Sequence, residues 1–240
     1  MLQLKGFTAG YTGRTLIDPV DLDFPSSRLT ALIGRNGTGK STLLRAIAGL
    51  NEKYSGEILI SGKEISAQTS EEKSRLLAFV NTERPRIADM TCRDVVGIGR
   101  APYTDWIGRL TENDDKIVGL ALDQVGMSGY ADRRLATLSD GECQRVMIAR
   151  ALAQDTPVVL LDEPTSFLDM PSRYELVALL RNLARESGKT ILFSTHELDI
   201  ALQRSDRIVL LADCRLRMLD PVVDPEAAAA EIEDAFGMSL

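Results

Sequence analysis

The sequence predicts an α/β fold built on a mainly parallel β-sheet. Three short apolar runs, at residues 30–33, Val158–Leu161 and Thr190–Ser194, have the composition of buried parallel strands, and each leads directly into polar or glycine residues. Leu43 and Ile47 recur at helical spacing behind the first run. Buried strands that alternate with helices are typical of sheets covered on both faces, and 240 residues are enough to bury such a core.

A glycine-rich loop connects the first predicted strand to its helix. Gly34, Gly39, Lys40 and Ser41 match the spacing G-x-x-x-x-G-K-[ST], in which backbone N–H groups and a helix N-terminus surround phosphate oxygens. Lys40 is expected to reach the β- and γ-phosphates, and the Ser41 hydroxyl to ligate Mg²⁺. The sequence therefore predicts a P-loop nucleotide-binding core. The other loop positions expected to contact the nucleotide are Asn36, Gly37 and Thr42.

The composition argues against several other kinds of protein. The formal net charge is −7, from 28 basic and 35 acidic residues, so we expect no nucleic-acid partner and no general affinity for anionic lipid. Cys92, Cys143 and Cys214 are far apart and lack a C-x-x-C pair, which favours free thiols in a reducing cytosol. No window approaches the roughly 18 apolar residues that span a bilayer. Any role at a membrane is therefore expected to depend on a partner.

The N-terminal region has the alternating pattern of half-solvated antiparallel strands. Residues 2–24 alternate apolar with charged side chains, and residues 58–60 continue the pattern after a Ser-Gly turn. Tyr11 lies in the glycine-flanked stretch 9–13. Its ring could stack on a nucleobase or pack as an ordinary surface aromatic, and the sequence favours neither interpretation.

The stretch between Lys40 and Asp162 is too long for a simple crossover between two strands, and much of it has helical spacing. We therefore expect one domain, residues 1–240, in which a helical subdomain is inserted into the nucleotide-binding core. The expected boundaries are about 1–83 and 151–240 for the core and about 84–150 for the helical subdomain.

Two apolar faces and one aromatic residue are expected to hold the helical part together. Trp106, the only tryptophan, belongs to a turn at residues 102–106. A buried anchor is its default interpretation, and an exposed contact for a partner protein is the alternative. The two predicted faces consist of Ile117, Leu120, Leu122 and Val125, and of Val146, Ile148, Ala149 and Leu152.

Acidic and histidine side chains follow two of the predicted strands. Asp162 and Glu163 come directly after Val158–Leu161, at the carboxyl end of a parallel strand, where open α/β sheets bind ligands. Asp162 suits Mg²⁺, and Glu163 is expected to orient or deprotonate an attacking water. His196, the only histidine, follows Thr190–Ser194 and is expected to contact a γ-phosphate.

The order of these motifs resembles that of ATP-binding cassette (ABC) ATPases over about residues 2–215. Residues 138–142 read LSDGE, which fits a helix capping box and resembles the family signature LSGGQ, and residues 166–169 resemble the D-loop. The resemblance implies hydrolysis of ATP, with Tyr11 stacked on adenine and His196 as the switch histidine. It also implies a head-to-tail homodimer, in which the signature of one subunit completes the ATP site of the other. The residues that this adds to the nucleotide site are Ser139, Gly141, Glu142 and Asp169.

Two positions depart from the family pattern. Thr82 stands where a glutamine usually contributes to Mg²⁺, and its hydroxyl is expected to serve instead, with Asn81 or Glu83 as alternatives. Asp140 stands where glycine is usual. A carboxylate about 4 Å from a phosphate charge would cost about 1 kcal/mol in water and several times more when desolvated. We therefore expect the Asp140 side chain to point away from the phosphates.

Residues 99–103 (GRAPY) resemble a G-R-x-P-[HY] run in the ATPase subunits of bacterial importers for iron chelates, haem and cobalamin. The resemblance implies two membrane permease subunits, contacted through about Thr82 to Tyr103, and a cytoplasmic position on the inner face of the cell membrane. The alternative is a soluble ABC-type ATPase that is not coupled to a transporter. A regulatory module without turnover is disfavoured, because Lys40 and Glu163 are both present.

Overall fold

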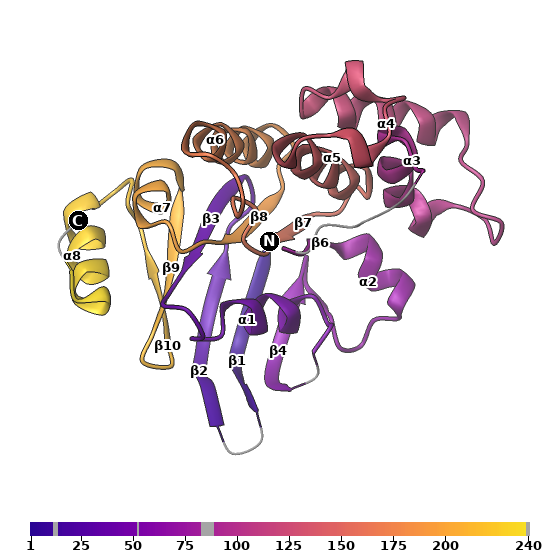
Figure 1. Cartoon of the computed structure of the whole chain (residues 1–240). Helices are drawn as coiled ribbons and strands as arrows, with labels where there is room; N and C mark the ends of the chain where they lie inside the picture. Colours follow the sequence, from indigo (N-terminus) through magenta and orange to yellow (C-terminus); the bar gives the residue numbers. More distant parts are fainter. Residues whose placement is uncertain (12–13, 52, 83–88, 239–240) are drawn as a thin grey trace.

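The computed structural model describes residues 1–11, 14–51, 53–82 and 89–238 (Figure 1). The strands in the described residues are β1 (Leu2–Tyr11), β2 (Arg14–Phe24), β3 (Arg28–Ile33), β4 (Tyr54–Ile60), β5 (Lys63–Glu64), β6 (Leu77–Val80), β7 (Val158–Leu161), β8 (Thr190–Ser194), β9 (Arg207–Ala212) and β10 (Arg215–Leu219). The α-helices there are α1 (Lys40–Ile47), α2 (Ser70–Leu76), α3 (Cys92–Gly97), α4 (Glu112–Gln124), α5 (Asp140–Ala153), α6 (Met170–Glu186), α7 (Leu198–Arg204) and α8 (Pro225–Phe236). Short 3₁₀ helices lie between α3 and α5: η1 (Ile98–Tyr103), η2 (Ser128–Tyr130) and η3 (Leu135–Thr137).

The strands form two sheets that differ in direction. The larger sheet has the order β10-β9-β3-β8-β7-β6; all its strands run parallel except β10, which pairs antiparallel with β9 at one edge. The smaller sheet, β2-β1-β4-β5, is antiparallel throughout. The predicted α/β fold, with a parallel core sheet and an N-terminal antiparallel sheet, is confirmed. None of the helices in the described part of the chain has both the length and the apolar composition needed to cross a membrane.

The parallel strands divide the apolar core between the two faces of their sheet. Successive side chains of a strand point to opposite faces. Leu192 of β8 accordingly packs with α1 and the antiparallel sheet, whereas the next residue, Phe193, packs with the helices of the other face. Leu160 and Leu161 of β7 divide in the same way. Burial of one such side chain contributes about 1.5–3 kcal/mol, so both faces hold the sheet in place.

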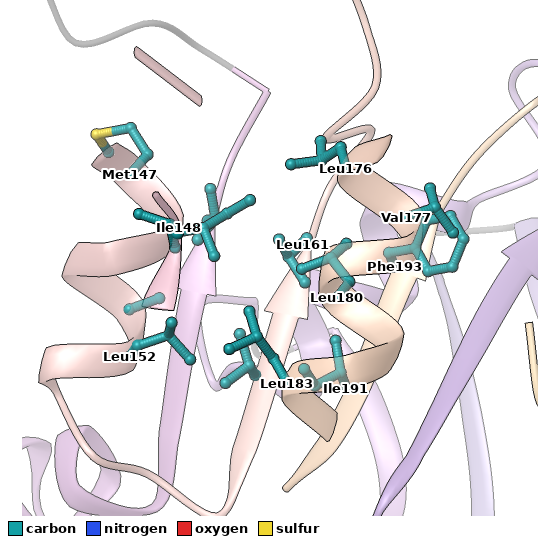
Figure 2. Packing of buried hydrophobic residues seen from close by; sticks show 14 of the residues in the cluster. Met147, Ile148, Leu152, Leu161, Leu176, Val177, Leu180, Leu183, Ile191 and Phe193 are labelled. Carbon is teal, nitrogen blue, oxygen red and sulfur yellow. The ribbon is translucent and has the colours of Figure 1, made fainter. Parts of the chain in front are cut away.

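Helices α5 and α6 cover the face of the parallel sheet that lies opposite α1 and the antiparallel sheet. Figure 2 shows apolar side chains of these two helices meeting those of the strands. The contact fixes β7 and β8, and therefore also the residues that follow these strands. The side chains labelled in Figure 2 are Met147, Ile148 and Leu152 of α5, Leu176, Val177, Leu180 and Leu183 of α6, and Leu161, Ile191 and Phe193 of the strands.

Two of the expected side-chain environments are wrong. Leu120, expected on a buried face, is 63% exposed, because the buried face of α4 is formed by Val118, Ala121 and Leu122 instead. Trp106 is 94% exposed and is therefore not a buried anchor. The residues of the second predicted face are buried as expected: Val146, Ile148, Ala149 and Leu152.

The GRAPY run at residues 99–103 joins several helices. Arg100 is buried, and it donates from Nε to Asp114 Oδ1 over 2.8 Å and from Nη1 to the Ala153 carbonyl over 2.7 Å. The Tyr103 ring lies over the Arg100 guanidinium, whose central carbon is 4.0 Å from the ring centroid. The run therefore connects η1 to α4 and to the end of α5.

Asp114 contributes stability that depends on pH. Hydrogen bonds from the Thr111 hydroxyl and backbone N–H, followed by the one from Arg100, lower its pKa from 3.8 to about 2. A carboxyl group whose pKa falls this far on folding contributes about 2 kcal/mol to the free energy of unfolding at neutral pH. The contribution is complete above pH 3.8 and is lost as the pH falls toward 2, because protonation of the folded protein then catches up with that of the unfolded chain.

We expect Asp114→Asn to lower the free energy of unfolding by about 2 kcal/mol at pH 7 and by about half as much at pH 3, measured by urea denaturation. Asp115→Asn is the matched control, because Asp115 is exposed on the same helical turn. Its effect should stay below about 1 kcal/mol. An equal loss in both variants, or a loss that does not change with pH, would contradict this role of Asp114.

Candidate active site

A cavity of about 540 Å³ lies where the phosphate-loop segment, the end of β7 and the end of β8 meet. Its walls come from segments that are far apart in the sequence, which the parallel sheet brings together at the carboxyl ends of its strands. Leu16 of β2 also lines it. The predicted site residues that line the cavity are Asn36, Gly37, Gly39, Lys40, Ser41, Thr42, Glu163 and His196.

Glycines allow the backbone of the phosphate loop to follow its path. Gly37 and Gly39 have left-handed φ angles of 78° and 113°, which other residues rarely adopt, and Gly39 is the N-cap of α1. Gly34 lies so close to the neighbouring strand β9 that a Cβ at this position would be 2.6 Å from the Leu211 carbonyl oxygen. The loop is therefore held in shape by glycine conformation at one end and by close packing at the other.

The Lys40 side chain extends along the inside of the phosphate loop and contacts its first residues. The residue is 6% exposed, and Nζ donates to the carbonyl oxygens of Gly34 over 2.8 Å and of Arg35 over 3.3 Å. Burial lowers the pKa of Lys40, while the nearby carboxylates of Glu163 and Asp162 act in the opposite direction. The positive charge is thus placed between the loop and the two acids.

Asp162 follows β7 and is almost fully buried. One oxygen, Oδ1, accepts hydrogen bonds from the Ser41 hydroxyl over 3.0 Å and from the Ser194 hydroxyl over 2.7 Å. Carboxylate and hydroxyl oxygens are the donors that Mg²⁺ prefers, and this ion usually keeps several waters and takes few protein ligands. Ser41 and Asp162 fit such a site, and no group of three or more Asp, Glu, His or Cys side chains that could hold a metal occurs among the described residues.

Glu163 has a left-handed backbone, with φ 47°, directly after the strand. Its N–H donates to the Ser194 hydroxyl over 2.8 Å, and its Oε2 accepts from the Ser166 hydroxyl over 3.0 Å. The other carboxylate oxygen lies 3.9 Å from Nδ1 of His196, whose side chain is 52% exposed. The carboxylate is thus directed toward the cavity side of the strand end, where the histidine also lies.

Thr82 lies beside the main chain of Asp162. Its hydroxyl donates to the Asp162 carbonyl oxygen over 2.9 Å. Thr82 therefore lies beside Asp162 at the end of β7, but it contacts the Asp162 backbone and not the carboxylate. Glu83, one of the alternatives for this role, lies outside the described residues, and so does the side chain of Tyr11 at the end of β1.

The signature-like residues form the start of α5. The Ser139 hydroxyl accepts from the Glu142 N–H over 3.4 Å, and Glu142 Oε2 accepts from the Ser139 N–H over 2.8 Å, so the predicted capping box is confirmed. The bonds from Ser139 lower the pKa of Glu142. A Cβ at Gly141 would lie 3.6 Å from Leu168 Cδ2, so the helix start touches the segment after Glu163. These residues do not line the cavity of their own chain.

The segment that resembles the D-loop presents apolar side chains to solvent. Phe167 has a φ of 70° and is 67% exposed, and Met170 is 64% exposed. Asp169 caps α6 by accepting the Ser172 N–H over 3.0 Å, and hydrogen bonding from the Ser172 side chain and N–H lowers the pKa of Asp169. Arg173 donates to the Leu168 carbonyl and forms an ion pair with Glu197, the residue after His196.

Two hydroxyl groups in the site were not predicted from the sequence. Ser166 contacts the Glu163 carboxylate, and Ser194 contacts both Asp162 and Glu163. The available signal for Ser194 is that it is the polar end of an otherwise mostly apolar run, two residues before His196. Its partner, however, depends on which strand lies next to β8.

Known proteins are similar to this chain in sequence and in fold. A family model described as "ABC transporter" matches residues 17–166. The "Achromobactin transport ATP-binding protein CbrD" of Dickeya dadantii (strain 3937) is 41% identical over 205 residues, which cover 85% of this chain and 76% of that protein. The "Iron(3+)-hydroxamate import ATP-binding protein FhuC" of Bacillus subtilis (strain 168) is 36% identical over 202 residues, which cover 84% of this chain and 75% of that protein.

A solved structure has the same architecture. It is described as "Dimeric Structure of MJ0796, a Bacterial ABC Transporter Cassette", and it superposes with a TM-score of 0.78 at 27% identity. The match covers 92% of this chain and 99% of the other. The family model spans more than half of the sequence, and both curated relatives exceed 30% identity over most of their own length. The chain therefore belongs to the ABC transporter family, as one of its ATP-binding ATPase subunits.

Proposed function

We propose that this chain is the ATP-hydrolysing subunit of a bacterial importer for an iron–siderophore complex. The observation that carries the proposal is that Lys40, Asp162 and Glu163 meet at one edge of the parallel sheet. A cation for phosphate, an oxygen ligand for Mg²⁺ and a carboxylate for water are the groups that phosphoryl transfer to water requires. The reaction is ATP + H₂O → ADP + phosphate.

The substrate class rests on similarity rather than on the residues of the site. One curated relative is named for achromobactin transport and the other for iron(3+)-hydroxamate import. The GRAPY run resembles that of importers for iron chelates, haem and cobalamin. We therefore favour an iron chelate, with haem and cobalamin as the alternatives within the same group. A soluble ABC-type ATPase without a transporter is not favoured, because both relatives are named for transport.

The phosphate loop binds the triphosphate. Lys40 releases the loop carbonyls and binds the β- and γ-phosphates. Ser41 and Asp162 would hold Mg²⁺, which would neutralise phosphate charge, and the Thr82 hydroxyl donates to the Asp162 carbonyl beside them in the chain. The backbone and side chains that surround the phosphates are those of Gly34, Asn36, Gly37, Gly39 and Thr42.

Glu163 acts on the attacking water. Its carboxylate accepts the proton of a water or holds that water in line with the γ-phosphate, and the Ser166 hydroxyl orients it. His196 contacts the γ-phosphate from the neighbouring strand end. Tyr11 stacks on adenine.

We expect Glu163→Gln to retain ATP binding within about threefold and to slow hydrolysis at least about a hundredfold, because proton transfer is lost while the phosphate contacts remain. A phosphate-release assay measures turnover, and calorimetric titration measures ATP affinity. Glu57→Gln, at an exposed position on β4, is the control and should hydrolyse ATP as the wild type does. Turnover near the wild-type rate in Glu163→Gln would show that another group acts as the base.

The ATP site is completed by a second copy of the chain, arranged head to tail. Ser139, Gly141 and Glu142 do not line the cavity of their own chain, which supports a role opposite the phosphate loop of the partner. The exposed Phe167 supports an interface beside the site, and a dimeric structure exists for a family member of the same fold. Asp140 is exposed at the first turn of α5, where its charge favours the helix terminus.

We expect Glu163→Gln to shift in light scattering from one chain mass toward two when ATP and Mg²⁺ are added, because ATP is bound but not removed. Adding Phe167→Asn should abolish the shift, since an apolar contact is lost while asparagine tolerates the left-handed backbone. The control is Val223→Asn, which replaces a residue that is 78% exposed before α8. Dimer formation that survives Phe167→Asn would contradict the interface.

A permease contacts the chain on the side where core and helical subdomain meet. We assign residues 84–150 to the helical subdomain and about 82–103 to the contact, of which residues 83–88 lie outside the described part of the chain. This assignment implies a cytoplasmic position on the inner membrane face. In this range Arg100 and Tyr103 are engaged within the chain. Beside them, Arg75 of α2 donates to the Pro102 carbonyl. The adjoining groove, of about 310 Å³, is lined by Ala48, Gly49, Leu50, Ser70, Lys73, Ser74, Leu77, Phe79 and Gln154.

We expect Leu50→Arg to reduce recovery of a polytopic membrane protein with the tagged chain from detergent-solubilised membranes, while ATP hydrolysis by the purified subunit stays unchanged. Leu50 is 66% exposed in the groove, so a charge there opposes docking without disturbing the core. Leu120→Arg is the matched control, because Leu120 is 63% exposed on α4, away from this groove. Equal recovery with Leu50→Arg and Leu120→Arg would exclude the groove as the docking site.

A further inference from the structure

We propose that Ser194 is a positioning residue for ATP hydrolysis, which holds the Asp162 carboxylate and the Glu163 backbone in their active arrangement. The inference rests on the proposed function, because it concerns the same two acids. Ser194 does not touch the nucleotide cavity. It acts through the two residues that do the chemistry.

The parallel register places Ser194 next to the acids. β7 and β8 pair with Leu161 opposite Phe193, so the next residues along, Asp162 and Ser194, lie side by side. The main chain of each continues the pairing on its far side: the Asp162 N–H donates to the Val80 carbonyl over 2.8 Å, and Ser194 pairs with Leu32 of β3. The position of Ser194 is therefore set by strand pairing and not by the phosphate loop.

The Ser194 hydroxyl is both a hydrogen-bond donor and a hydrogen-bond acceptor. Its hydrogen is donated to Asp162 Oδ1 over 2.7 Å, and its oxygen accepts the Glu163 N–H over 2.8 Å. The residue is 0% exposed, so water is not available to replace either bond. A single side chain thus fixes the carboxylate of one acid and the backbone of the next.

Glu163 depends on such a bond because of its backbone. Its φ of 47° lies in the left-handed region, which is unfavourable for a residue other than glycine. This conformation turns the Glu163 carboxylate away from the strand direction and toward Ser166 and His196. The hydrogen bond that the Glu163 N–H donates to the Ser194 hydroxyl stabilises the turn where it begins.

Asp162 is held from two sides, and the two contacts differ. Ser41 belongs to the phosphate loop and is a proposed Mg²⁺ ligand, whereas Ser194 belongs to the sheet. The contact from Ser194 therefore does not compete with the proposed role of Ser41. It orients Asp162 in the absence of nucleotide as well as in its presence.

The chain provides a matched control in Ser205. Its side chain is buried, with 2% of the residue exposed, and within the described part of the chain its Oγ has no hydrogen-bond partner. Ser205→Ala and Ser194→Ala each delete one buried hydroxyl. Only the second deletion removes bonds to Asp162 and Glu163.

The first experiment measures ATP hydrolysis by purified full-length protein. We expect Ser194→Ala to lower kcat about tenfold to a hundredfold with KM for ATP changed less than about threefold, because groups are misplaced while nucleotide contacts remain. Ser205→Ala should stay within about twofold of the wild type, and Ser194→Thr, which retains the hydroxyl, should recover most of the lost kcat. If Ser194→Ala does not fold, Ser194→Cys replaces it, because the thiol is similar in size and a weaker hydrogen-bond donor and acceptor.

The second experiment needs neither nucleotide nor metal. In the nucleotide-free protein, exchange of the Glu163 amide hydrogen, followed by NMR, should be about tenfold faster in Ser194→Ala than in the wild type or in Ser205→Ala. A merely structural role would instead accelerate exchange throughout β7 and β8.

The outcomes separate this inference from the proposed function. Wild-type protein that hydrolyses ATP, together with Ser194→Ala of unchanged kcat or unchanged Glu163 exchange, would overturn the role of Ser194 alone. An equal loss of kcat in Ser205→Ala would do the same. Wild-type protein that does not hydrolyse ATP, or Glu163→Gln that hydrolyses it normally, would instead overturn the proposed function.

Discussion

The parallel pairing of β7 with β8 is the constraint on which the site depends. It sets Asp162 beside Ser194 and brings Glu163 and His196 to the same edge of the sheet. Apolar side chains on both faces of these strands hold the register, since a slip of one residue would exchange the two faces and expose each buried set to the wrong neighbours. The chemistry at the strand ends is therefore a product of core packing several residues away.

Much of this arrangement was predictable, because the residues involved have narrow physical requirements. The buried strands β3, β7 and β8 consist mostly of apolar residues, and the phosphate loop is defined by its spacing. The rest depends on neighbours that a single sequence does not specify. The sequence of α4 offers more than one apolar face, and its contact with α5 decides that Leu120 remains outside. Ser194 looks like any polar strand end until its partner strand is known.

The GRAPY run illustrates how a short sequence resemblance relates to structure. A Cβ at Gly99 would lie 2.2 Å from the Arg150 carbonyl oxygen, so glycine is required for contact with α5. Arg100 satisfies the Ala153 carbonyl at the end of the same helix, and Tyr103 covers Arg100 and donates to the Gln154 carbonyl. The residues of the run thus have packing roles in this chain. A shared run of this kind therefore indicates first that α5 packs against its neighbours in the same way.

The resting position of Lys40 affects which anions the loop admits. Its ammonium donates to two backbone carbonyls, and these hydrogen bonds hold the lysine along the phosphate loop. A hydrogen bond to a charged group is worth about 1.5–3 kcal/mol, and an incoming anion must compete with two of them. Chloride and other small monovalent ions offer too little in exchange, whereas a polyphosphate offers several charged oxygens at once. The two bonds of the lysine therefore favour a polyphosphate over a small monovalent anion at this loop.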